Sequence, residues 1–342
     1  MYSKLKNKNI LIFGNSGFVG SWLSLTLNHF KANILGVSLK MKNENYLSNS
    51  IQFRKHIKTI NCDINNLSKI SKIIKKFNPE IVIHLASQPI VLEGYKDPKN
   101  TFYTNIFGTI KIFELIKKTK SIKKIVVFTS DKVYSNNYKT LYENSILGGL
   151  DPYSASKSCQ DIISQCYNFS FMNKDMIILR SGNIIGGGDW GSNRLMPDII
   201  NSIKKKQKLK IRALYSTRPW LHVLDVINGI LLVINKKIKK EKTNIYNLAP
   251  NKKNQVTVKK LLDLIKRNSM VKSLKVSTVK NKVQEKKHLN LSSNKIFVEL
   301  GWKSKLNILK SLDLTLKLYL TQKNKLFDET RKQISSFFRK NY

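Results

Sequence analysis

The sequence predicts an α/β protein in which a doubly wound parallel sheet is followed by a smaller C-terminal lobe. Short apolar runs alternate with segments of helical periodicity between residues 9 and 182, which is the pattern of parallel strands linked by helices. Three glycines follow the first apolar run, at the point where a strand would pass into a helix. The chain has 342 residues, of which 41% are hydrophobic, and this is enough for a large buried core.

The first half of the chain contains the regular part of this alternation. Each predicted strand is a continuous apolar run, as expected for strands that are buried on both faces of a sheet. The predicted strands are 9–14, 33–39, 80–86, 124–130 and 176–182. The predicted helices are 17–30, 68–77, 101–118 and 153–171.

The second half of the chain is less regular. Glycine, proline and tryptophan cluster between residues 186 and 220. The elements predicted beyond this cluster are a helix at 225–236, a strand at 244–248 and mainly helices after Val256. We therefore expect a first domain at 1–182 and a smaller lobe at 183–342, with residues 220–250 returning to the first domain.

The glycines have the spacing GxxGxxG, over Gly14, Gly17 and Gly20. In a dinucleotide-binding Rossmann fold the first glycine allows a tight turn and the second lets backbone N–H groups approach a pyrophosphate. The third lets helix and strand pack closely. A plain glycine-rich turn is the alternative, but the position after the first strand favours a cofactor site. The loop residues predicted to bind the cofactor are Gly14, Ser16, Gly17, Phe18 and Gly20.

Two positions bear on the choice of dinucleotide. A carboxylate at the end of the second strand would hold the adenosine ribose, but Ser38, Leu39 and Lys40 occupy that place. This position therefore leaves NAD and NADP both open. Asp63 is predicted to contact the adenine, with an acid in a surface turn as the alternative.

Tyr153 and Lys157 form a YxxxK pair at the start of a predicted helix, where a spacing of four places both side chains on one face. An ammonium beside a phenol stabilises the phenolate, so we expect Lys157 to lower the pKa of Tyr153. The tyrosine can then take a proton from a sugar hydroxyl while a hydride leaves the same carbon. Ser130, at the end of the preceding strand, supplies a hydroxyl for the same substrate oxygen.

Ser130 is followed by Asp131 and Lys132, which a simple alcohol oxidation does not need. An elimination does need such a pair. Once carbon 4 of a hexose is a ketone, the hydrogen on carbon 5 becomes acidic and a hydroxyl can leave from carbon 6. Asp131 is the predicted acid and Lys132 the predicted base, and a turn pair without chemistry is the alternative.

Longer strings around these residues resemble the extended short-chain dehydrogenase/reductase family and, within it, the CDP-glucose 4,6-dehydratases. The sharpest of them is the SDK triplet, because the dTDP-glucose dehydratases have an acid where Lys132 stands. The resemblance runs nearly from end to end. Its strings are GFVGSWLS (17–24), HLASQPIV (84–91), TSDKVY (129–134), LGGLDPYSASKSC (147–159), GNIIGGGDWGSNRLMPD (182–198), RPWLHVLD (218–225) and LFDETRKQISSFF (326–338).

The resemblance implies a complete reaction. NAD would be the cofactor, regenerated in each turnover, and Ala86 would join its site together with Tyr153 and Lys157. CDP-glucose would be dehydrated to CDP-4-keto-6-deoxyglucose. This product is a precursor of deoxysugars in surface polysaccharides such as the lipopolysaccharide O-antigen.

The resemblance also implies that the first domain binds NAD and that the smaller lobe binds the nucleotide sugar. Asn183 would lie near the phosphates. Arg194 and Arg218 would hold the CDP pyrophosphate, with solvated surface charges as the alternative. His222 is placed in the same substrate-binding set, with a packed and hydrogen-bonded side chain as the alternative.

Assembly and loop length can also be compared with the family. The family pairs subunits through a helix bundle, so helices 101–118 and 153–171 would join a homodimer or homotetramer. The chain departs from the family at Val19, where lysine is common, and near Leu92, where an arginine is expected. The loop 135–146 looks shorter and lacks the expected tryptophans and arginine, which bears on the choice of sugar.

The composition argues against several other classes of protein. Cys62, Cys159 and Cys166 form no CxxC pair, so neither a disulfide framework nor a metal site is predicted. No apolar run has the length of a membrane span, and no secretory signal follows the charged N-terminus. We therefore expect a cytoplasmic protein without membrane contacts.

The net charge is unusual, since 62 Lys and Arg against 21 Asp and Glu give +41. Nucleic-acid binding is one interpretation. Basic runs such as 204–206 are flanked by apolar helical segments rather than by aromatic residues arranged for base stacking, so a charge spread over the surface is favoured. An epimerase or reductase on the same scaffold is a further alternative, although neither reaction needs the Asp131–Lys132 pair.

Overall fold

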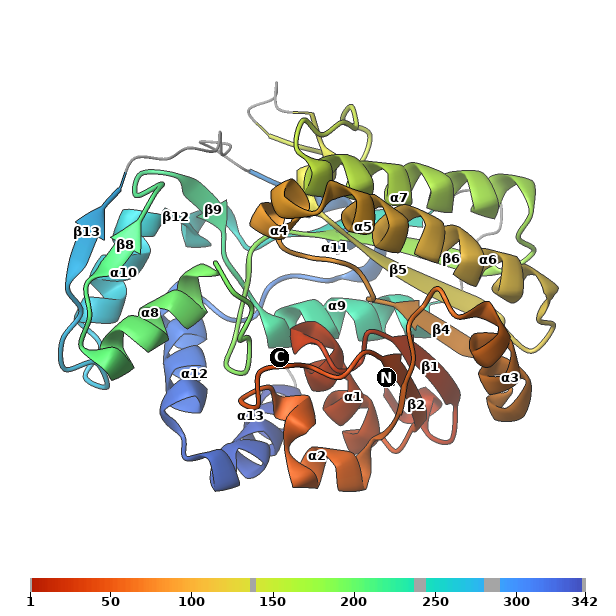
Figure 1. Ribbon diagram of the computed structural model, residues 1–342, viewed down its shortest axis with the longest axis horizontal. Coiled ribbons are helices and arrows are strands. Elements are labelled where there is room, and N and C mark those ends of the chain that lie inside the picture. The colour runs from red at the N-terminus through yellow and green to blue at the C-terminus, as the bar shows by residue number, and fades with distance from the viewer. Residues whose placement is uncertain (1, 136–139, 237–243, 280–289, 340–342) are drawn as a thin grey trace.

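The computed structural model describes residues 2–135, 140–236, 244–279 and 290–339. At its centre is a seven-stranded sheet in the order β3-β2-β1-β4-β5-β6-β11, and every neighbouring pair is parallel (Figure 1). The predicted doubly wound parallel sheet is therefore confirmed. Its strands are β1 (Asn9–Phe13), β2 (Asn33–Ser38), β3 (Lys58–Asn61), β4 (Ile81–His84), β5 (Lys124–Ser130), β6 (Asp175–Ser181) and β11 (Asn244–Leu248).

Helices cover both faces of this sheet because successive residues of a strand point to opposite sides. In β1, Ile10 and Ile12 belong to a core shared with α1 and α9, whereas Leu11 and Phe13 belong to a core shared with α3 and α6. The helices of this part are α1 (Phe18–His29), α2 (Ile51–His56), α3 (Leu67–Phe77), α4 (Val91–Lys96), α5 (Pro98–Phe102), α6 (Gly108–Lys118), α7 (Pro152–Ser170) and α9 (Val223–Asn235).

A third core lies in the second half of the chain, where α8, α10 and α12 pack around Trp220 and small paired strands. The remaining helices are α8 (Leu195–Lys205), α10 (Val258–Lys266), α11 (Asn294–Leu300), α12 (Ile308–Leu320) and α13 (Leu326–Arg339). The small strands are β7 (Ile184–Ile185), β8 (Leu209–Ile211), β9 (Thr217–Pro219), β10 (Leu221–His222), β12 (Gln255–Thr257) and β13 (Val276–Thr278).

Parts of the second half pack against the first. Strand β11 pairs with β6 at the edge of the central sheet, and α9 packs against α1. Helix α13 also contacts α1, and the ring of Tyr2 lies 5.5 Å from that of Phe338 and 4.8 Å from that of Phe30. Both ends of the described chain therefore lie on the same side of the sheet (Figure 1).

Some local features differ from the sequence prediction. The predicted helix 101–118 is interrupted by one π-helical turn, η3 (Tyr103–Phe107), between α5 and α6. Strand β3 and helix α2 are absent from the prediction, because each is short and β3 has no buried residue to mark it as an apolar run. Of the predicted loop 135–146, residues 136–139 lie outside the described residues.

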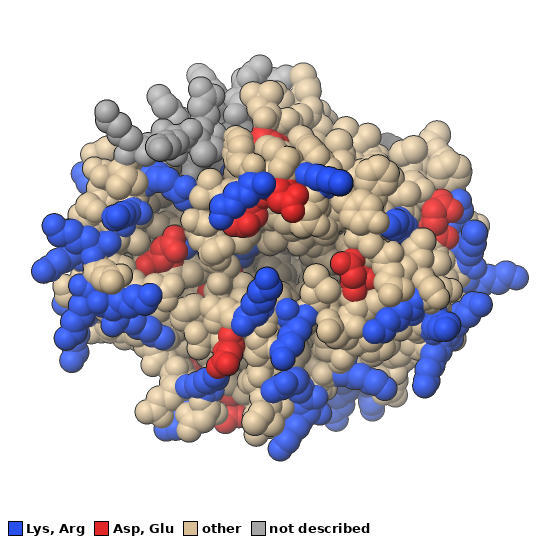
Figure 2. Space-filling view, viewed as in Figure 1, with Lys and Arg blue, Asp and Glu red and all other residues tan. Residues whose placement is uncertain are grey.

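Figure 2 shows Lys and Arg side chains scattered over the left, central, lower and right parts of the visible face, with few acidic ones between them. They do not form a single continuous stripe on this face. Within the described ranges no helix is both long and apolar enough to cross a bilayer. The same residues contain no group of three or more His, Cys, Asp or Glu that could hold a metal ion.

Candidate active site

A cavity of about 730 Å³ lies at the carboxyl ends of the central strands, between the sheet and the third core. This edge is where open parallel sheets bind their ligands. Its wall contains nearly every residue predicted for the site. Those lining residues are Gly14, Gly17, Phe18, Gly20, Asp63, Ala86, Ser130, Asp131, Lys132, Tyr153, Lys157, Asn183, Arg194 and Arg218.

The glycine loop packs so closely against neighbouring backbone that Gly14 and Gly20 have no room for a side chain. Gly14 has φ +86°, and a Cβ there would lie 2.7 Å from the backbone nitrogen of Ala86. A Cβ on Gly20 would lie 2.2 Å from the carbonyl oxygen of Gly14. Gly17 is the N-cap of α1 and has no side chain to bond the first-turn amides, which leaves those donors for a phosphate.

Ser16 and Asp63 are also predicted to bind the cofactor, and they differ in whether they line the cavity. Ser16 belongs to the loop but not to the cavity wall, and its carbonyl accepts a hydrogen bond of 2.8 Å from Ser48 Oγ. Asp63 lines the cavity, and its Oδ1 accepts from the backbone and side chain of Asn65 at 2.7 and 3.0 Å. Ser38 and Leu39 line the cavity at the end of β2, where no carboxylate stands.

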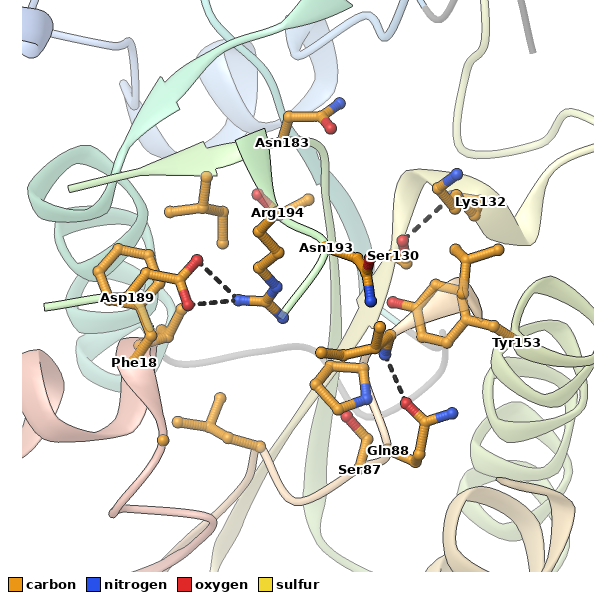
Figure 3. Close-up of a pocket in the computed structure, with 18 of the residues that line it drawn as sticks. Phe18, Ser87, Gln88, Ser130, Lys132, Tyr153, Asn183, Asp189, Asn193 and Arg194 are labelled. Atoms are coloured by element: carbon orange, nitrogen blue, oxygen red, sulfur yellow. Dashed lines mark hydrogen bonds and ion pairs between the residues drawn. The ribbon is translucent and has the colours of Figure 1, made fainter. Parts of the chain in front are cut away.

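The structure places Ser130 and Tyr153 together, from the end of β5 and the first turn of α7 (Figure 3). Pro152 and the capping side chain of Asp151 start α7 just before the tyrosine. Burial raises the pKa of Tyr153 to about 12, while its hydrogen bond with Ser130 acts in the opposite direction. A phenol with this pKa stays protonated until its proton is handed to a partner.

Lys157 lies one turn along α7 and is almost fully buried. Burial lowers its pKa to about 7, and the nearby Asp161 opposes that shift. Its Nζ donates to Gln160 Oε1 at 2.8 Å and to the carbonyl of Phe128 at 3.3 Å. The expectation that Lys157 lowers the pKa of Tyr153 is therefore wrong for this structure, because burial of the phenol dominates and the amine has other partners.

Asp131 and Lys132 follow directly after β5, in a short 3-10 turn, η4 (Asp131–Val133). Asp131 is buried, with 3% of its surface exposed, and its Oδ1 accepts from Ser130 Oγ at 3.0 Å. The backbone nitrogen of Lys132 donates to the same hydroxyl at 3.2 Å. The carboxyl of Asp131 and the backbone of Lys132 thus both contact the serine that adjoins Tyr153, and both residues line the same cavity.

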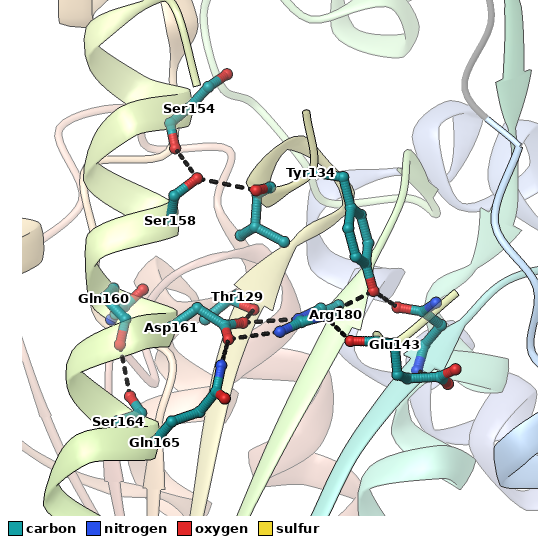
Figure 4. A network of polar contacts seen from close by, with 12 residues as sticks. Thr129, Tyr134, Glu143, Ser154, Ser158, Gln160, Asp161, Ser164, Gln165 and Arg180 are labelled. Atoms are coloured by element: carbon teal, nitrogen blue, oxygen red, sulfur yellow. Dashed lines mark hydrogen bonds and ion pairs between the residues drawn. The ribbon is translucent and has the colours of Figure 1, made fainter. Parts of the chain in front are cut away.

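A buried polar network lies behind this wall (Figure 4). Arg180 on β6 makes two bonds of 2.7 and 2.8 Å to Asp161 on α7, and both side chains are at most 1% exposed. Thr129, next to Ser130, donates to Asp161 at 3.0 Å. Tyr134 receives a bond from Arg180 and gives one of 2.6 Å to Asn247 on β11. The network ties α7, β5, β6 and β11 together behind Ser130 and Tyr153.

The opposite wall of the cavity is rich in cations. Arg194 uses a single nitrogen, Nη1, to contact both carboxylate oxygens of Asp189 at 2.9 Å, and its side chain is 32% exposed. Figure 3 shows its guanidinium directed into the cavity, across from Tyr153. Arg218 is buried on β9 and also lines the cavity. Such guanidinium groups suit phosphate oxygens.

His222 does not lie in the cavity wall. It is buried, its Nδ1 accepts from the backbone nitrogen of Leu224 at 3.2 Å, and it caps α9. Its ring packs edge-on against Trp22 with centroids 6.2 Å apart, and burial lowers its pKa to about 3. The structure therefore places His222 as a neutral packing and capping group, away from the other predicted substrate residues.

The cavity also contains polar residues that the sequence analysis did not predict. Gln88, Asp189 and Asn193 line it, and Asn193 has an unusual positive φ of 57°. Lys210 and Arg212 add two cations from β8 and the residue after it. The cluster of glycine and asparagine at 186–193 was a usable signal for Asn193, because Asn tolerates left-handed backbone. Nothing local marks the short strand β8.

Comparisons with known proteins agree with this geometry. The family model described as the NAD dependent epimerase/dehydratase family matches residues 10–249. The CDP-glucose 4,6-dehydratase of Salmonella typhimurium is 32% identical over 327 residues, which cover 91% of this chain and 90% of that protein. The dTDP-glucose 4,6-dehydratase of Haemophilus influenzae is 26% identical over 335 residues, which cover 91% of this chain and 98% of that protein.

Solved structures show the same fold. The UDP-glucuronic acid 4-epimerase of Bacillus cereus, in complex with UDP-glucuronic acid and NAD, has a TM-score of 0.82 at 21% identity, covering 91% of this chain and 98% of that one. The dTDP-glucose 4,6-dehydratase of Bacillus anthracis, in complex with NAD, has a TM-score of 0.78 at 23% identity, covering 91% and 96%. The match over 10–249 and the 32% identity together establish that this chain belongs to the NAD dependent epimerase/dehydratase family.

Proposed function

We propose that this chain is a nucleotide-sugar 4,6-dehydratase and that CDP-glucose is its substrate. The observation that supports this most directly is the position of Asp131 and Lys132. They flank Ser130 beside Tyr153, in the cavity that also contains the glycine loop. An oxidation followed by an elimination needs these two sets of groups around one sugar ring.

The glycine loop, Asp63, Ala86 and Lys157 are the residues proposed to hold NAD. The loop fits because no side chain caps the first-turn amides of α1 at Gly17, so these donors can bond a pyrophosphate. When bound, NAD would supply a nicotinamide that accepts the hydride from carbon 4 and returns it to carbon 6 after the loss of water. The family and the NAD complexes among the solved structures support this cofactor.

The first proton transfer belongs to Tyr153. Tyr153 would act in its phenolate form, after giving up its own proton, and would take the proton of the hydroxyl on carbon 4, while Ser130 would hold the same oxygen by a hydrogen bond. Lys157 would stabilise the charge on this side of the cavity. The carbon 4 ketone that results makes the hydrogen on carbon 5 acidic.

Asp131 and Lys132 would carry out the elimination. The amine of Lys132 would take the proton from carbon 5, and the carboxyl of Asp131 would give a proton to the hydroxyl leaving carbon 6. One water is lost, and the proton held by Lys132 returns to carbon 5 at the end of the turnover. The product is a 4-keto-6-deoxy sugar, a precursor of deoxysugars such as those of lipopolysaccharide O-antigen.

The substrate would lie between these groups and the cationic wall. Arg194 and Arg218 would bind the pyrophosphate, and Asn183 would lie near it. The name of the Salmonella typhimurium relative supports CDP-glucose, and the SDK triplet agrees with that choice. All three cysteines are free, which suits a reducing cytoplasm.

A panel of CDP-, dTDP-, GDP- and UDP-hexoses tests the proposal. With CDP-glucose the purified protein should give the ultraviolet absorbance of a 4-keto-6-deoxy sugar in alkali, without net NADH. Lasting NADH would indicate a dehydrogenase, and a changed configuration at carbon 4 would indicate an epimerase. Either outcome would contradict the dehydratase. Turnover of another nucleotide sugar alone would contradict the assignment of CDP.

A homodimer is part of the same proposal. Large apolar side chains lie exposed on the contacting segments η3 and α7, with exposures of 53% for Phe107, 52% for Ile162 and 91% for Phe169. Helices α6 and α7 lie side by side along the edge of the molecule (Figure 1). Light scattering should give twice the chain mass, and Phe107→Glu with Ile162→Glu should give the single chain. A wild-type monomer would contradict the dimer.

A further inference from the structure

A second cavity adjoins the active site at the end of β2. Its volume is about 1000 Å³, and Met41 and Tyr46 line both it and the first cavity. Its floor is aromatic, with Trp190, Tyr319 and Phe327 among the lining residues. It therefore begins where the ribose end of a dinucleotide held by the glycine loop would lie.

The wall of this second cavity is strongly basic. Its only acid among the described residues is Glu44, whose carboxylate contacts Lys323 at 3.3 Å. Both of these side chains are largely exposed, so the pair is weak. The cations in the wall are Lys40, Lys42, Arg54, Lys55, Lys204 and Lys323. An anion at this place would meet attraction with almost no opposing charge.

Hydrogen bonds hold the lysine-bearing segment in place. Asn49 Nδ2 donates to the carbonyls of Met41 and Asn43 at 2.8 and 2.9 Å, which fixes the chain on either side of Lys42. The bond from Ser48 Oγ to the carbonyl of Ser16 joins the same segment to the glycine loop. The cations of residues 40–55 are thus tied to the loop proposed to hold the pyrophosphate.

We propose that the cations of this second cavity, Lys40 and Lys42 first among them, bind the 2′-phosphate of a dinucleotide, so that the chain accepts NADP as well as NAD. The inference rests on the proposed function, because it needs a dinucleotide at the glycine loop. A carboxylate at the end of β2 would bond the ribose hydroxyls and repel a phosphate. Here Ser38, Leu39 and Lys40 replace that carboxylate, and the charge of the site has the opposite sign.

The dehydration itself is compatible with either dinucleotide. The hydride is returned within each turnover, so no external pool of oxidised cofactor drives the reaction. Selection at the 2′ position therefore depends on binding alone. This makes the affinity for the adenosine half the direct measurement of the inference, independent of turnover.

Calorimetric titration of the full-length protein with adenosine 2′,5′-bisphosphate and with 5′-AMP isolates the 2′-phosphate. We expect the bisphosphate to bind about tenfold more tightly or better, since charge-assisted hydrogen bonds to phosphate are the strong ones. Lys40→Ala and Lys42→Ala should each remove most of this difference while 5′-AMP binds as before. Lys72→Ala, an exposed lysine on α3 outside both cavities, is the matched control and should change neither affinity.

A charge-reversal variant provides the second test of the inference. Lys40→Asp should weaken NADP binding and strengthen NAD binding, because the new carboxylate can bond the ribose hydroxyls. Equal affinities for the bisphosphate and 5′-AMP, or variants without effect, would overturn the inference while leaving NAD binding intact. Inorganic phosphate binding in the second cavity as tightly as the bisphosphate would also overturn it, in favour of a free anion. Failure of all adenosine ligands to bind would instead contradict the proposed function.

Discussion

Arg180 and Arg194 each pair with an aspartate, yet they belong to regions of different character. Arg180 is 1% exposed, and its N–H groups donate hydrogen bonds to Asp161, Tyr134 and the carbonyl of Glu143. Arg194 has a side chain that is 32% exposed, and within the described chain only its Nη1 has a partner. The region around Arg180 is closed to solvent and its hydrogen-bond donors have partners. The region around Arg194 is open to the cavity, and Arg194 has further N–H groups that could bind a ligand.

The difference separates positioning from binding. A satisfied buried network keeps the end of β5 and helix α7 in one arrangement, which the proton transfers proposed for Tyr153 and Asp131 require. A cation with spare donors can bond phosphate oxygens without first breaking its own contacts. Changes in the first region should therefore alter rate and stability, and changes in the second should alter affinity.

The largest effect is expected at Tyr153. Tyr153→Phe removes the proposed proton acceptor without changing the shape of the ring, so kcat should fall by about 10³-fold while the Kd for the nucleotide sugar stays nearly the same. Steady-state kinetics and calorimetry measure the two quantities. Tyr142→Phe, at a 50% exposed tyrosine, is the control. A variant that retains full turnover would remove Tyr153 from the mechanism.

Disruption of the buried network around Arg180 should lower the free energy of unfolding. Arg180→Met leaves Asp161 buried without its partner, which is expected to cost about 3–5 kcal/mol in the free energy of unfolding. Removing both charges, in Arg180→Met with Asp161→Leu, should cost less than the single change, because no uncompensated charge remains. Urea unfolding measures both values. Equal losses in the two variants would show that the pair is not the source of the effect.

A smaller effect is expected at the open arginine. Arg194→Gln removes the charge facing the cavity, and the KM for CDP-glucose should rise about tenfold, or about 1.4 kcal/mol, with kcat little changed. Arg267→Gln, at an exposed arginine outside both cavities, is the matched control. A fall in kcat at unchanged KM would show that Arg194 acts in the chemical step rather than in substrate binding. The proposed difference in role between Arg194 and Arg180 would then be wrong.

The smallest effect concerns pH. Because burial lowers the pKa of Lys157 to about 7, the unfolded chain binds a proton there between pH 7 and about 10 that the folded chain does not. This group therefore makes the protein more stable as pH rises through that window. Lys157→Met should flatten the rise and add about 1 kcal/mol of stability at pH 7 while lowering turnover. Unfolding curves at several pH values test this, and identical slopes in both proteins would contradict it.

The sequence predicted the elements that depend on local pattern. The strands from β1 to β6 that are continuous apolar runs, the glycine loop, and the turn at Ser130 all have signatures within a few neighbours. Strand β3 has no such signature, since its exposed and half-buried residues gain their partner only from β2.

The parts of the site that were not predicted depend on distant contacts. The pairing of Arg180 with Asp161 joins a strand to a helix across the tertiary structure, and no spacing rule links the two residues. Arg212 reaches the cavity because β8 pairs with β13, far along the chain. The burial of Lys157, which lowers its pKa, also depends on distant contacts such as the one with the carbonyl of Phe128.

The packing of helix α13 against α1 has a consequence for synthesis. Ile334 and Phe337 belong to the same core as Leu23 and Leu27 of α1, the helix that follows the glycine loop. A nascent chain that has emerged only as far as residue 320 would leave that apolar surface in water. The core around α1 can therefore be completed only when α13 has left the ribosome, and fragments that stop before α13 should aggregate.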